Sequence, residues 1–244
     1  MSGHSHWATI KRKKASNDAK KGQTLSKLMG AVYVALRFGT NPANNLSLKS
    51  AIEKAKTGGV TQDTIDRALS RAAEEKALEE VVYEVYGPSG IAILIRAYTD
   101  NNNRTFNEIK HMVSNYGKMA EPGTAKWLFE EKGVIAIAKT DFQESFGDEL
   151  IGVGLEDYRE DDSMKDGGPA EGGGEEVILI TDPKSFFEVK TVLEKKGVKA
   201  TFDELQFLPK NAVEISENDK EQLQKQIDKF LDNPDVSQVF SNIA

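Results

Sequence analysis

The segment Val81-Val82-Tyr83-Glu84-Val85-Tyr86-Gly87-Pro88-Ser89-Gly90-Ile91-Ala92-Ile93-Leu94-Ile95 decides the fold class of the chain. Two apolar runs, rich in β-branched and aromatic residues, flank a Gly-Pro-Ser-Gly turn, and this arrangement predicts a β-hairpin. Apolar residues recur at helical spacing before the hairpin, whereas strand and helix patterns alternate after it. We therefore predict an α+β protein, in which a three-helix N-terminal domain precedes two α+β sandwich domains of ferredoxin-like type.

Three amphipathic helices are predicted ahead of the hairpin. The first covers residues 25–36, because apolar side chains recur there along one helical face. The second runs from about Ser47 to the Gly58-Gly59 pair, and the third begins near Thr61, a residue type favoured at the N-cap. Together they predict a small helical bundle.

The pattern after the hairpin predicts two α+β units. The expected elements are a helix over 106–115, strands over 125–130 and 134–138, a helix over 141–153, a strand over 177–180, a helix over 185–196, strands over 200–207 and 212–215, a helix over 219–231 and a strand over 236–240. Asp100 or Asn103 is the expected cap of the first of these helices.

The expected domains are residues 1–78, residues 79–132 together with 208–244, and residues 133–207, the last inserted within the second. The inserted domain carries an acidic segment, Glu156–Glu176, which holds nine acidic residues against Arg159 and Lys165. Because like charges and glycines accumulate there, we expect a solvated, mobile loop.

Charge is distributed unevenly along the chain. The 244 residues include no cysteine and have a formal net charge of −7. Residues 1–37 hold eight Lys and Arg against one Asp, a local charge of +7, so the remainder sums to −14. Such asymmetry is a signature of an interaction surface. The lack of cysteine excludes disulfides, zinc fingers and thiol nucleophiles.

The sequence predicts neither a membrane partner nor a targeting segment. No apolar run reaches the ~20 residues that a membrane span needs. Neither a secretory signal nor a mitochondrial leader pattern is present at the N-terminus, so the cytoplasm is the expected location.

The main functional prediction concerns the basic arm, residues 2–14, in which cations accompany one tryptophan. Lys and Arg neutralise phosphates, and an indole stacks on an unpaired base, so we expect a nucleic-acid partner. The alternative is that Trp7 and Ile10 pin the arm to the helical bundle while the lysines stay solvated. The candidate binding residues are His4, His6, Trp7, Lys11, Arg12, Lys13, Lys14, Lys20, Lys21, Lys27 and Arg104.

Catalytic signatures are scarce. No GxSxG, GxxxxGK[ST] or HExxH motif occurs, and His111 lies on a predicted helix as an expected partly exposed side chain. We predict that the protein is not an enzyme, and we expect no catalytic residue, cofactor or small-molecule substrate. If Met1 is removed, Ser2-Gly3-His4 offers a square-planar Cu(II) or Ni(II) site; the alternative, which we favour, is that both histidines are polar members of the arm, with no metal.

Several motifs are similar to those of one known family. They are Ser2-Gly3-His4-Ser5, Trp7-Ala8-Thr9-Ile10-Lys11, Asp18-Ala19-Lys20-Lys21-Gly22, Ala51-Ile52-Glu53-Lys54-Ala55-Lys56, Tyr86-Gly87-Pro88, Thr99-Asp100-Asn101-Asn102-Asn103-Arg104-Thr105, Trp127-Leu128-Phe129-Glu130, Lys132-Gly133-Val134-Ile135 and Asp235-Val236-Ser237-Gln238-Val239-Phe240-Ser241-Asn242. In this order they resemble the YebC family, which includes the mitochondrial translational activator of cytochrome c oxidase. The family's glycine-rich loop before the tryptophan strand is Gly117–Gly123 here, without its middle glycine.

The resemblance implies a three-domain protein with no enzymatic activity. Members are commonly described as cytoplasmic DNA-binding transcriptional regulators, whereas others point to translation on the ribosome, including relief of stalling on proline-rich stretches. The residues themselves fit ribosomal RNA at least as well, since no recognition helix with base-reading side chains and no dimerisation signal is apparent. A protein-interaction scaffold, whose acidic segment binds a basic partner, is a further alternative. The sequence predicts no oligomeric state.

Overall fold

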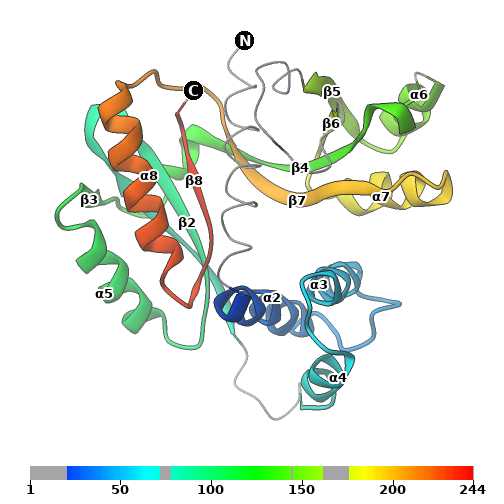
Figure 1. Ribbon diagram of the computed structural model, residues 1–244, viewed down its shortest axis with the longest axis horizontal. Coiled ribbons are helices and arrows are strands. Elements are labelled where there is room, and N and C mark those ends of the chain that lie inside the picture. The colour runs from blue at the N-terminus through cyan, green and yellow to red at the C-terminus, as the bar shows by residue number, and fades with distance from the viewer. Residues whose placement is uncertain (1–20, 72–77, 144, 162–175, 244) are drawn as a thin grey trace. The chain divides into compact units, whose positions relative to one another are not determined.

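The computed structural model describes residues 21–71, 78–143, 145–161 and 176–243, and it shows an α+β fold (Figure 1). Within these ranges the chain forms seven α-helices and two four-stranded antiparallel sheets, which confirms the predicted fold class. Two compact units can be distinguished. One contains residues 21–128 and 213–243, and the other contains residues 129–212.

Three helices form the N-terminal part of the first unit. They are α2 (Lys21–Leu36), α3 (Leu46–Thr57) and α4 (Gln62–Arg71). Their apolar faces pack together, and Val32, Leu48 and Ile65 are fully buried in the shared core. The three helices predicted from the apolar spacing are therefore confirmed.

Asn45 fixes the connection between α2 and α3. Its side-chain oxygen accepts a hydrogen bond from the Leu48 amide at 3.0 Å, which makes it the N-cap of α3. Its Nδ2 donates to the Ala35 and Gly39 carbonyls, each at 2.8 Å. One buried side chain thus satisfies backbone groups at the end of one helix and the start of the next.

The first sheet has the strand order β3-β1-β2-β8. Its strands are β1 (Glu79–Tyr86), β2 (Ala92–Thr99), β3 (Lys118–Met119) and β8 (Val236–Ser241). The predicted hairpin is confirmed, because β1 pairs antiparallel with β2 across the short 3₁₀ turn η1 (Pro88–Gly90). β8 pairs with the other edge of β2, so a C-terminal segment completes a sheet that begins before residue 100.

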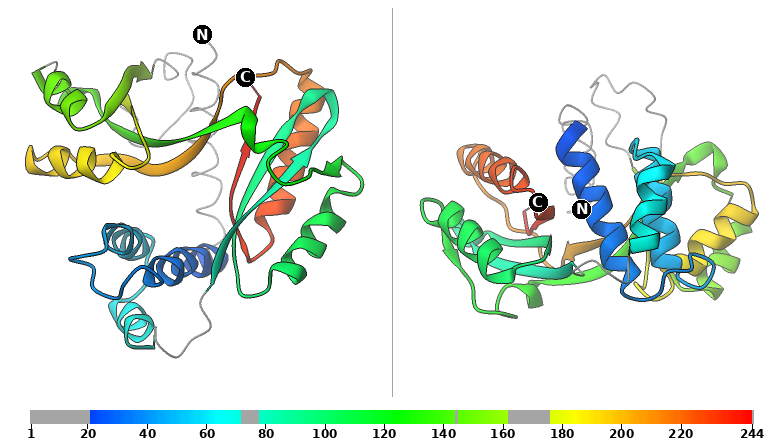
Figure 2. Two further views of the ribbon diagram at one scale, coloured as in Figure 1. Left: turned by 180° about the vertical axis from the view of Figure 1, so that it is seen from behind. Right: turned by 90° about the horizontal axis from the view of Figure 1, so that it is seen from below.

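Two helices cover one face of this sheet. α5 (Asn102–Val113) and α8 (Glu217–Leu231) lie side by side on it (Figure 2). The alternate residues Ile93 and Ile95 of β2 meet Ile109 of α5 and Phe230 of α8 in the core, and all four are fully buried. The period-two pattern of the strand and the helical period of its partners therefore bury the same face.

The inserted unit contains the second sheet, with strand order β5-β6-β4-β7. Its strands are β4 (Phe129–Ala138), β5 (Leu155–Asp161), β6 (Glu176–Thr181) and β7 (Ala200–Pro209). The helices α6 (Ser145–Gly152) and α7 (Phe186–Lys195) join its core on one face, where Ile135, Leu179 and Val189 are fully buried. The chain leaves the first sheet after β3 and returns to it at β8, so this unit is an insertion.

At its two described ends the acidic segment Glu156–Glu176 is strand rather than the predicted loop. Its first residues belong to β5, an edge strand paired with β6, and Glu176 begins β6; residues 162–175 lie outside the described ranges. Lys132 binds Glu156 and Lys139 binds Glu160, each at 2.7 Å. The acidic side chains of β5 thus lie at a sheet edge, where charge opposes pairing with the strands of other chains. The acidic composition of residues 156–161 is typical of a loop, although these residues form a strand.

Two further local predictions were wrong. Residues 125–130 do not form a separate strand, because η2 (Lys126–Leu128) is a 3₁₀ turn and β4 runs uninterrupted from Phe129 through Gly133. Residues 212–215 form no strand either: Val213 makes only an isolated bridge to Ile243.

Candidate nucleic-acid interface

Most of the predicted binding residues lie in residues 1–20, outside the described part of the chain. They are His4, His6, Trp7, Lys11, Arg12, Lys13, Lys14 and Lys20. Lys21 is the first residue of α2. Of the predicted binding residues, the structure describes the side chains of Lys27 and Arg104. The hydrogen bond of Lys27 and the ion pairs of Arg104 involve different partners among the described residues.

Lys27 projects from α2 toward the end of α8. Its ammonium donates a hydrogen bond to the Leu231 carbonyl oxygen at 2.5 Å. The last carbonyls of a helix have no intrahelical partner, and a cation there also complements the helix dipole. Lys27 therefore caps the C-terminal end of α8, a structural role, and its contact with a phosphate stays a prediction.

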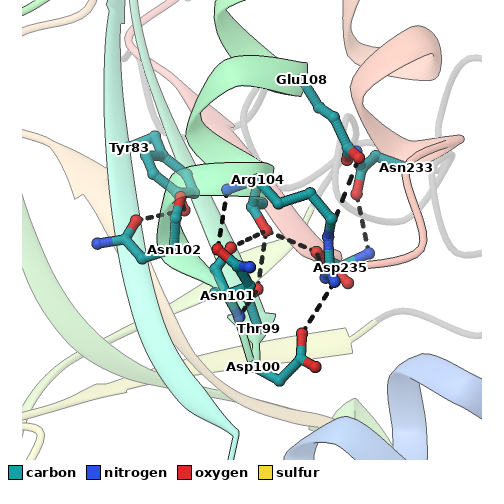
Figure 3. A network of polar contacts seen from close by, with 10 residues as sticks. Tyr83, Thr99, Asp100, Asn101, Asn102, Arg104, Glu108, Asn233 and Asp235 are labelled. Carbon is teal, nitrogen blue, oxygen red and sulfur yellow. Dashed lines mark hydrogen bonds and ion pairs between the residues drawn. The ribbon is translucent and has the colours of Figure 1, made fainter.

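Arg104 stands in the first turn of α5, and Figure 3 shows its guanidinium among three carboxylates. Nη2 lies 2.6 Å from Asp235 Oδ2, Nη1 lies 3.0 Å from Asp100 Oδ1, and Nε lies 4.0 Å from Glu108 Oε1. The hydrogen bond that Arg104 donates to Asp235, together with the negative charge of Asp235, raises the pKa of the guanidinium above its ordinary value. One cation against three anions leaves a negative local charge, which does not favour a phosphate.

Asp235 also anchors a chain of hydroxyl groups (Figure 3). Its Oδ2 lies 2.6 Å from Thr105 Oγ1, which lies 2.8 Å from Thr99 Oγ1. Because an ionised carboxylate only accepts, Thr105 donates to Asp235 and Thr99 donates to Thr105. Thr99 in turn accepts from the Asn101 amide at 2.9 Å. We call these contacts, with those of Arg104, the Arg104–Asp235 network.

The cap of α5 differs from the prediction. Asn101, rather than Asp100 or Asn103, is the N-cap, and its Oδ1 accepts from the Arg104 amide at 3.1 Å. Asp100 faces the Arg104 guanidinium instead. A run of one Asp and three Asn residues offers four suitable caps, and only the extended backbone at Asn101 selects one.

Neighbouring polar groups extend the network on both sides. Asn233 donates to Glu108 Oε2 at 2.8 Å and accepts from the Asp235 amide at 2.9 Å. Tyr83 Oη donates to Asn102 Oδ1 at 2.8 Å, and burial raises the pKa of this phenol. The network thus joins the end of β2, the start of α5 and the turn before β8, and its geometry is that of a structural joint.

A second fixed feature is the Trp127 loop, residues 120–128, which the sequence reasoning missed as a site. The Glu84 carboxylate, in β1, is only 5% exposed and accepts from the amides of Gly123 at 2.5 Å, Ala125 at 2.7 Å and Lys126 at 2.8 Å. Tyr86 Oη also donates to the carbonyl oxygen of Thr124. At the end of this loop the Trp127 side chain is 63% exposed. In the sequence, the charged residue Glu84 within the apolar strand pattern of residues 81–86 indicates a buried carboxylate that needs polar partners, and these partners are the amides of the loop.

The connection between α3 and α4 is short and contains Gly58 and Gly59, as in helix-turn-helix proteins. Two exposed polar residues of α4, Gln62 and Arg67, have acidic partners on the same helix. Gln62 donates to Asp66 at 2.7 Å, and Arg67 lies 2.5 Å from Asp63. Side chains that would read base edges are therefore engaged within the helix.

Of the helices in the described ranges, none combines the length and the apolar character that a membrane crossing requires. His111 is exposed on α5, as expected.

These features define a class of protein: a helical part, a discontinuous α+β part and an inserted α+β part, with positive charge concentrated near the N-terminus. Two family models match the chain, the TACO1/YebC protein N-terminal domain over residues 5–75 and the TACO1/YebC second and third domain over residues 78–243. The chain belongs to the TACO1/YebC family, which confirms the resemblance seen in its motifs.

Relatives support this assignment over the full length. A probable transcriptional regulatory protein of Caldanaerobacter subterraneus subsp. tengcongensis is 42% identical over 100% of this chain and 98% of its own. One from Kosmotoga olearia is 39% identical over 99% of this chain and 94% of its own. The crystal structure of a conserved hypothetical protein from Aquifex aeolicus superposes with a TM-score of 0.77 at 34% identity, and covers 93% of this chain and 91% of that one.

Proposed function

We propose that this protein is a non-enzymatic, cytoplasmic regulator of gene expression that binds nucleic acid through its basic arm. The observation that carries the proposal is the charge distribution, +7 within residues 1–37 against −14 in the remainder. The printed names of the relatives, probable transcriptional regulatory proteins, favour DNA as the target.

Counterion release supplies the binding energy in this proposal. Each Lys or Arg that neutralises a phosphate frees condensed cations, so the energy comes from the basic arm rather than from the net acidic remainder of the chain. The proposal assigns the phosphate contacts to the arm rather than to Arg104, because the Arg104–Asp235 network already surrounds that guanidinium with three carboxylates. Positional contacts of this kind carry no sequence information by themselves.

A specific observation favours a second candidate, a ribosome-associated factor that binds ribosomal RNA. Gln62 and Arg67 of α4 bind Asp66 and Asp63 of the same helix. The helix that would enter a major groove therefore holds these two side chains in contacts of its own rather than toward base edges. Structured RNA is recognised by shape and phosphate contacts. Crosslinking in cells followed by sequencing of the attached nucleic acid decides between promoter DNA and ribosomal RNA.

A salt titration tests the common part of both candidates. Five contacts between duplex phosphates and the six Lys and Arg residues within positions 11–21 predict a loss of affinity of about 500-fold between roughly 50 and 200 mM salt. Replacing Lys11, Arg12, Lys13 and Lys14 by Ala is expected to lower the affinity and to flatten this salt dependence by about 0.9 per lost contact on a log–log plot.

The matched control removes four exposed lysines from the inserted unit. These are Lys184, Lys195, Lys199 and Lys210. This variant loses the same charge and is expected to keep the affinity and salt dependence of the parent protein. If the arm variant binds nucleic acid as tightly as the parent protein with the same salt dependence, the arm is not the binding element. A protein-interaction scaffold would retain its basic protein partner after the change in the arm.

A further inference from the structure

We propose that Trp127 is a stacking platform for an unpaired base, and so forms a second nucleic-acid contact distinct from the basic arm. This proposal rests on the nucleic-acid-binding function proposed above. It starts from the contrast between Trp127, which is 63% exposed, and Phe129, which follows two residues later and is 4% exposed. The turn η2 directs one aromatic ring outward and the next into the protein.

The outward position of Trp127 is held by its loop. Three backbone amides bind the buried Glu84 carboxylate, and the Tyr86 hydroxyl binds the Thr124 carbonyl, so the backbone immediately before Trp127 is fixed from two strand residues. A buried carboxylate is retained only where its oxygens are well satisfied. The backbone beside such a platform loses little conformational freedom when a base stacks on the indole.

The charge around the ring indicates which occupant fits. Lys126 precedes Trp127, and Lys118 sits on β3 opposite Tyr86, the residue that binds the same loop. Both lysines are exposed, and the exposed acid in residues 117–128 is Glu121. The segment is thus net positive in a chain whose residues after position 37 sum to −14.

A protein partner that binds through apolar contacts would need further exposed apolar side chains beside the ring. In residues 120–128 the other exposed residues are Glu121, Pro122, Gly123, Thr124 and Lys126, so Trp127 is the one exposed large apolar residue of this described stretch. An exposed indole with an exposed lysine, Lys126, next to it in the chain is an arrangement on which nucleic-acid bases stack, with a phosphate near the lysine. The geometry therefore points to an unpaired nucleotide.

Fluorescence can report on this site alone. The chain has two tryptophans, Trp7 and Trp127, so the full-length Trp7→Phe variant leaves Trp127 as the single indole. Unlabelled oligoriboadenylate, oligodeoxyadenylate, a DNA duplex of the same length and heparin are titrated in turn, while anisotropy of end-labelled oligonucleotides measures binding independently. The expected result is quenching of Trp127 by the single strands, and none by heparin, which is a polyanion without bases.

Comparison of the two single strands identifies the source of the base. Stronger quenching by oligoriboadenylate assigns the site to RNA, and stronger quenching by oligodeoxyadenylate assigns it to separated DNA strands. Binding seen by anisotropy without any change in Trp127 emission would overturn the stacking proposal and leave the proposed function intact. Absence of binding by either method would overturn both.

Affinity provides a second readout in the otherwise unchanged protein. Trp127→Ala is expected to weaken binding of oligoriboadenylate roughly 5- to 150-fold, and Trp127→Phe to restore most of it, because any aromatic face can stack. The matched control is Tyr158→Ala, since Tyr158 is 44% exposed on the acidic strand β5 and should not contact the ligand. Equal losses in the Ala and Phe variants, or in Tyr158→Ala, would contradict stacking at Trp127.

Discussion

Arg104 Nη2 lies 2.6 Å from Asp235 Oδ2, although 131 residues separate the two in the chain. Arg104 lies in the first turn of α5, and Asp235 immediately precedes β8. The Asp235 carbonyl also accepts from the Tyr98 amide at 2.8 Å, so this residue is held to β2 through its backbone and to α5 through its side chain. The pair joins the returning C-terminal segment to the part of the first sheet made before the insertion.

Removal of the Asp235 carboxylate should destabilise the first unit. Asp235→Ala deprives Arg104 of its closest acidic partner and leaves the buried Thr105 hydroxyl only the more distant Asn101 carbonyl oxygen as acceptor, at 3.2 Å, so we expect a loss of about 2 kcal/mol in the free energy of unfolding. Urea denaturation measures it. The matched control is Asp63→Ala, which breaks an exposed ion pair with Arg67 on α4 and should cost about 0.5 kcal/mol or less. Equal losses would contradict a structural role for the network.

Gly133→Ala should destabilise the inserted unit through a close approach. A Cβ at Gly133 would lie 2.3 Å from Thr181 Oγ1 and 2.5 Å from Phe186 Cδ2, both in packed surroundings. Overpacking of this kind costs about 1–3 kcal/mol. Gly147→Ala is the internal control: no atom lies within 4 Å of its Cβ position, and a helical Gly→Ala change there should stabilise by up to about 1 kcal/mol. Thermal denaturation of both variants shows whether each change lowers or raises the melting temperature. A Gly133→Ala protein that is more stable than the parent would contradict the close approach as the reason for glycine.

Alkaline pH should weaken the first unit through Tyr116. Burial, with a contribution from the negative charge of Asp219, raises the pKa of the Tyr116 phenol from 10.0 to about 12. The unfolded chain therefore releases the proton first, so the stabilisation is complete below pH 10 and is lost as the pH rises toward 12. Tyr116→Phe should remove this part of the pH dependence. Urea denaturation across that interval measures it, and an unchanged slope in the variant would contradict the assignment.

Tyr116→Phe should be harmless at neutral pH. The hydroxyl is buried and has no hydrogen-bond partner among the described residues, so its removal leaves no group unsatisfied. The variant thus separates the alkaline effect from general damage to the core, because its stability below pH 10 should match or exceed that of the parent protein.

Glu84→Gln should loosen the Trp127 loop without changing its surface. Oε1 accepts from Gly123, and Oε2 accepts from Ala125 and Lys126, so an amide group must place donors against donors. We expect a loss of about 1–3 kcal/mol and faster hydrogen exchange at the amides of Ala125 and Lys126. Unchanged exchange at these amides would show that the carboxylate does not hold the loop.

The sequence predicted those parts of the fold that depend on local patterns. The helical faces of α2, α3 and α4 and the β1–β2 hairpin follow from apolar period and turn residues that lie within one segment. The edge strand β5 was missed because its acidic composition is typical of a loop, whereas its backbone pairs with β6. Gly133 suggested a boundary between strands, but the close approach of Thr181 and Phe186 is what requires glycine there.

The candidate site was less predictable because its contacts are distant in sequence. No local pattern near Arg104 indicates that Asp235 occupies its guanidinium, or that Lys27 caps α8 at Leu231. The loop that ends at Trp127 is bound by Glu84, some forty residues earlier in the chain, and a tryptophan beside Leu and Phe is typical of a buried strand. The assignment of the arm as the binding element remains a prediction, as do the boundaries of the three domains.

The order of the strands in the first sheet has a consequence for synthesis. As a nascent chain leaves the ribosome, the whole inserted unit emerges before β8, and domains tend to fold as they appear. Until then one edge of β2, including Leu94 and Ile95, has no neighbour and offers a template for pairing with other polypeptides. A polypeptide that ends before Val236 would keep every residue of the inserted unit, and yet its first sheet would lack β8, one of the four strands.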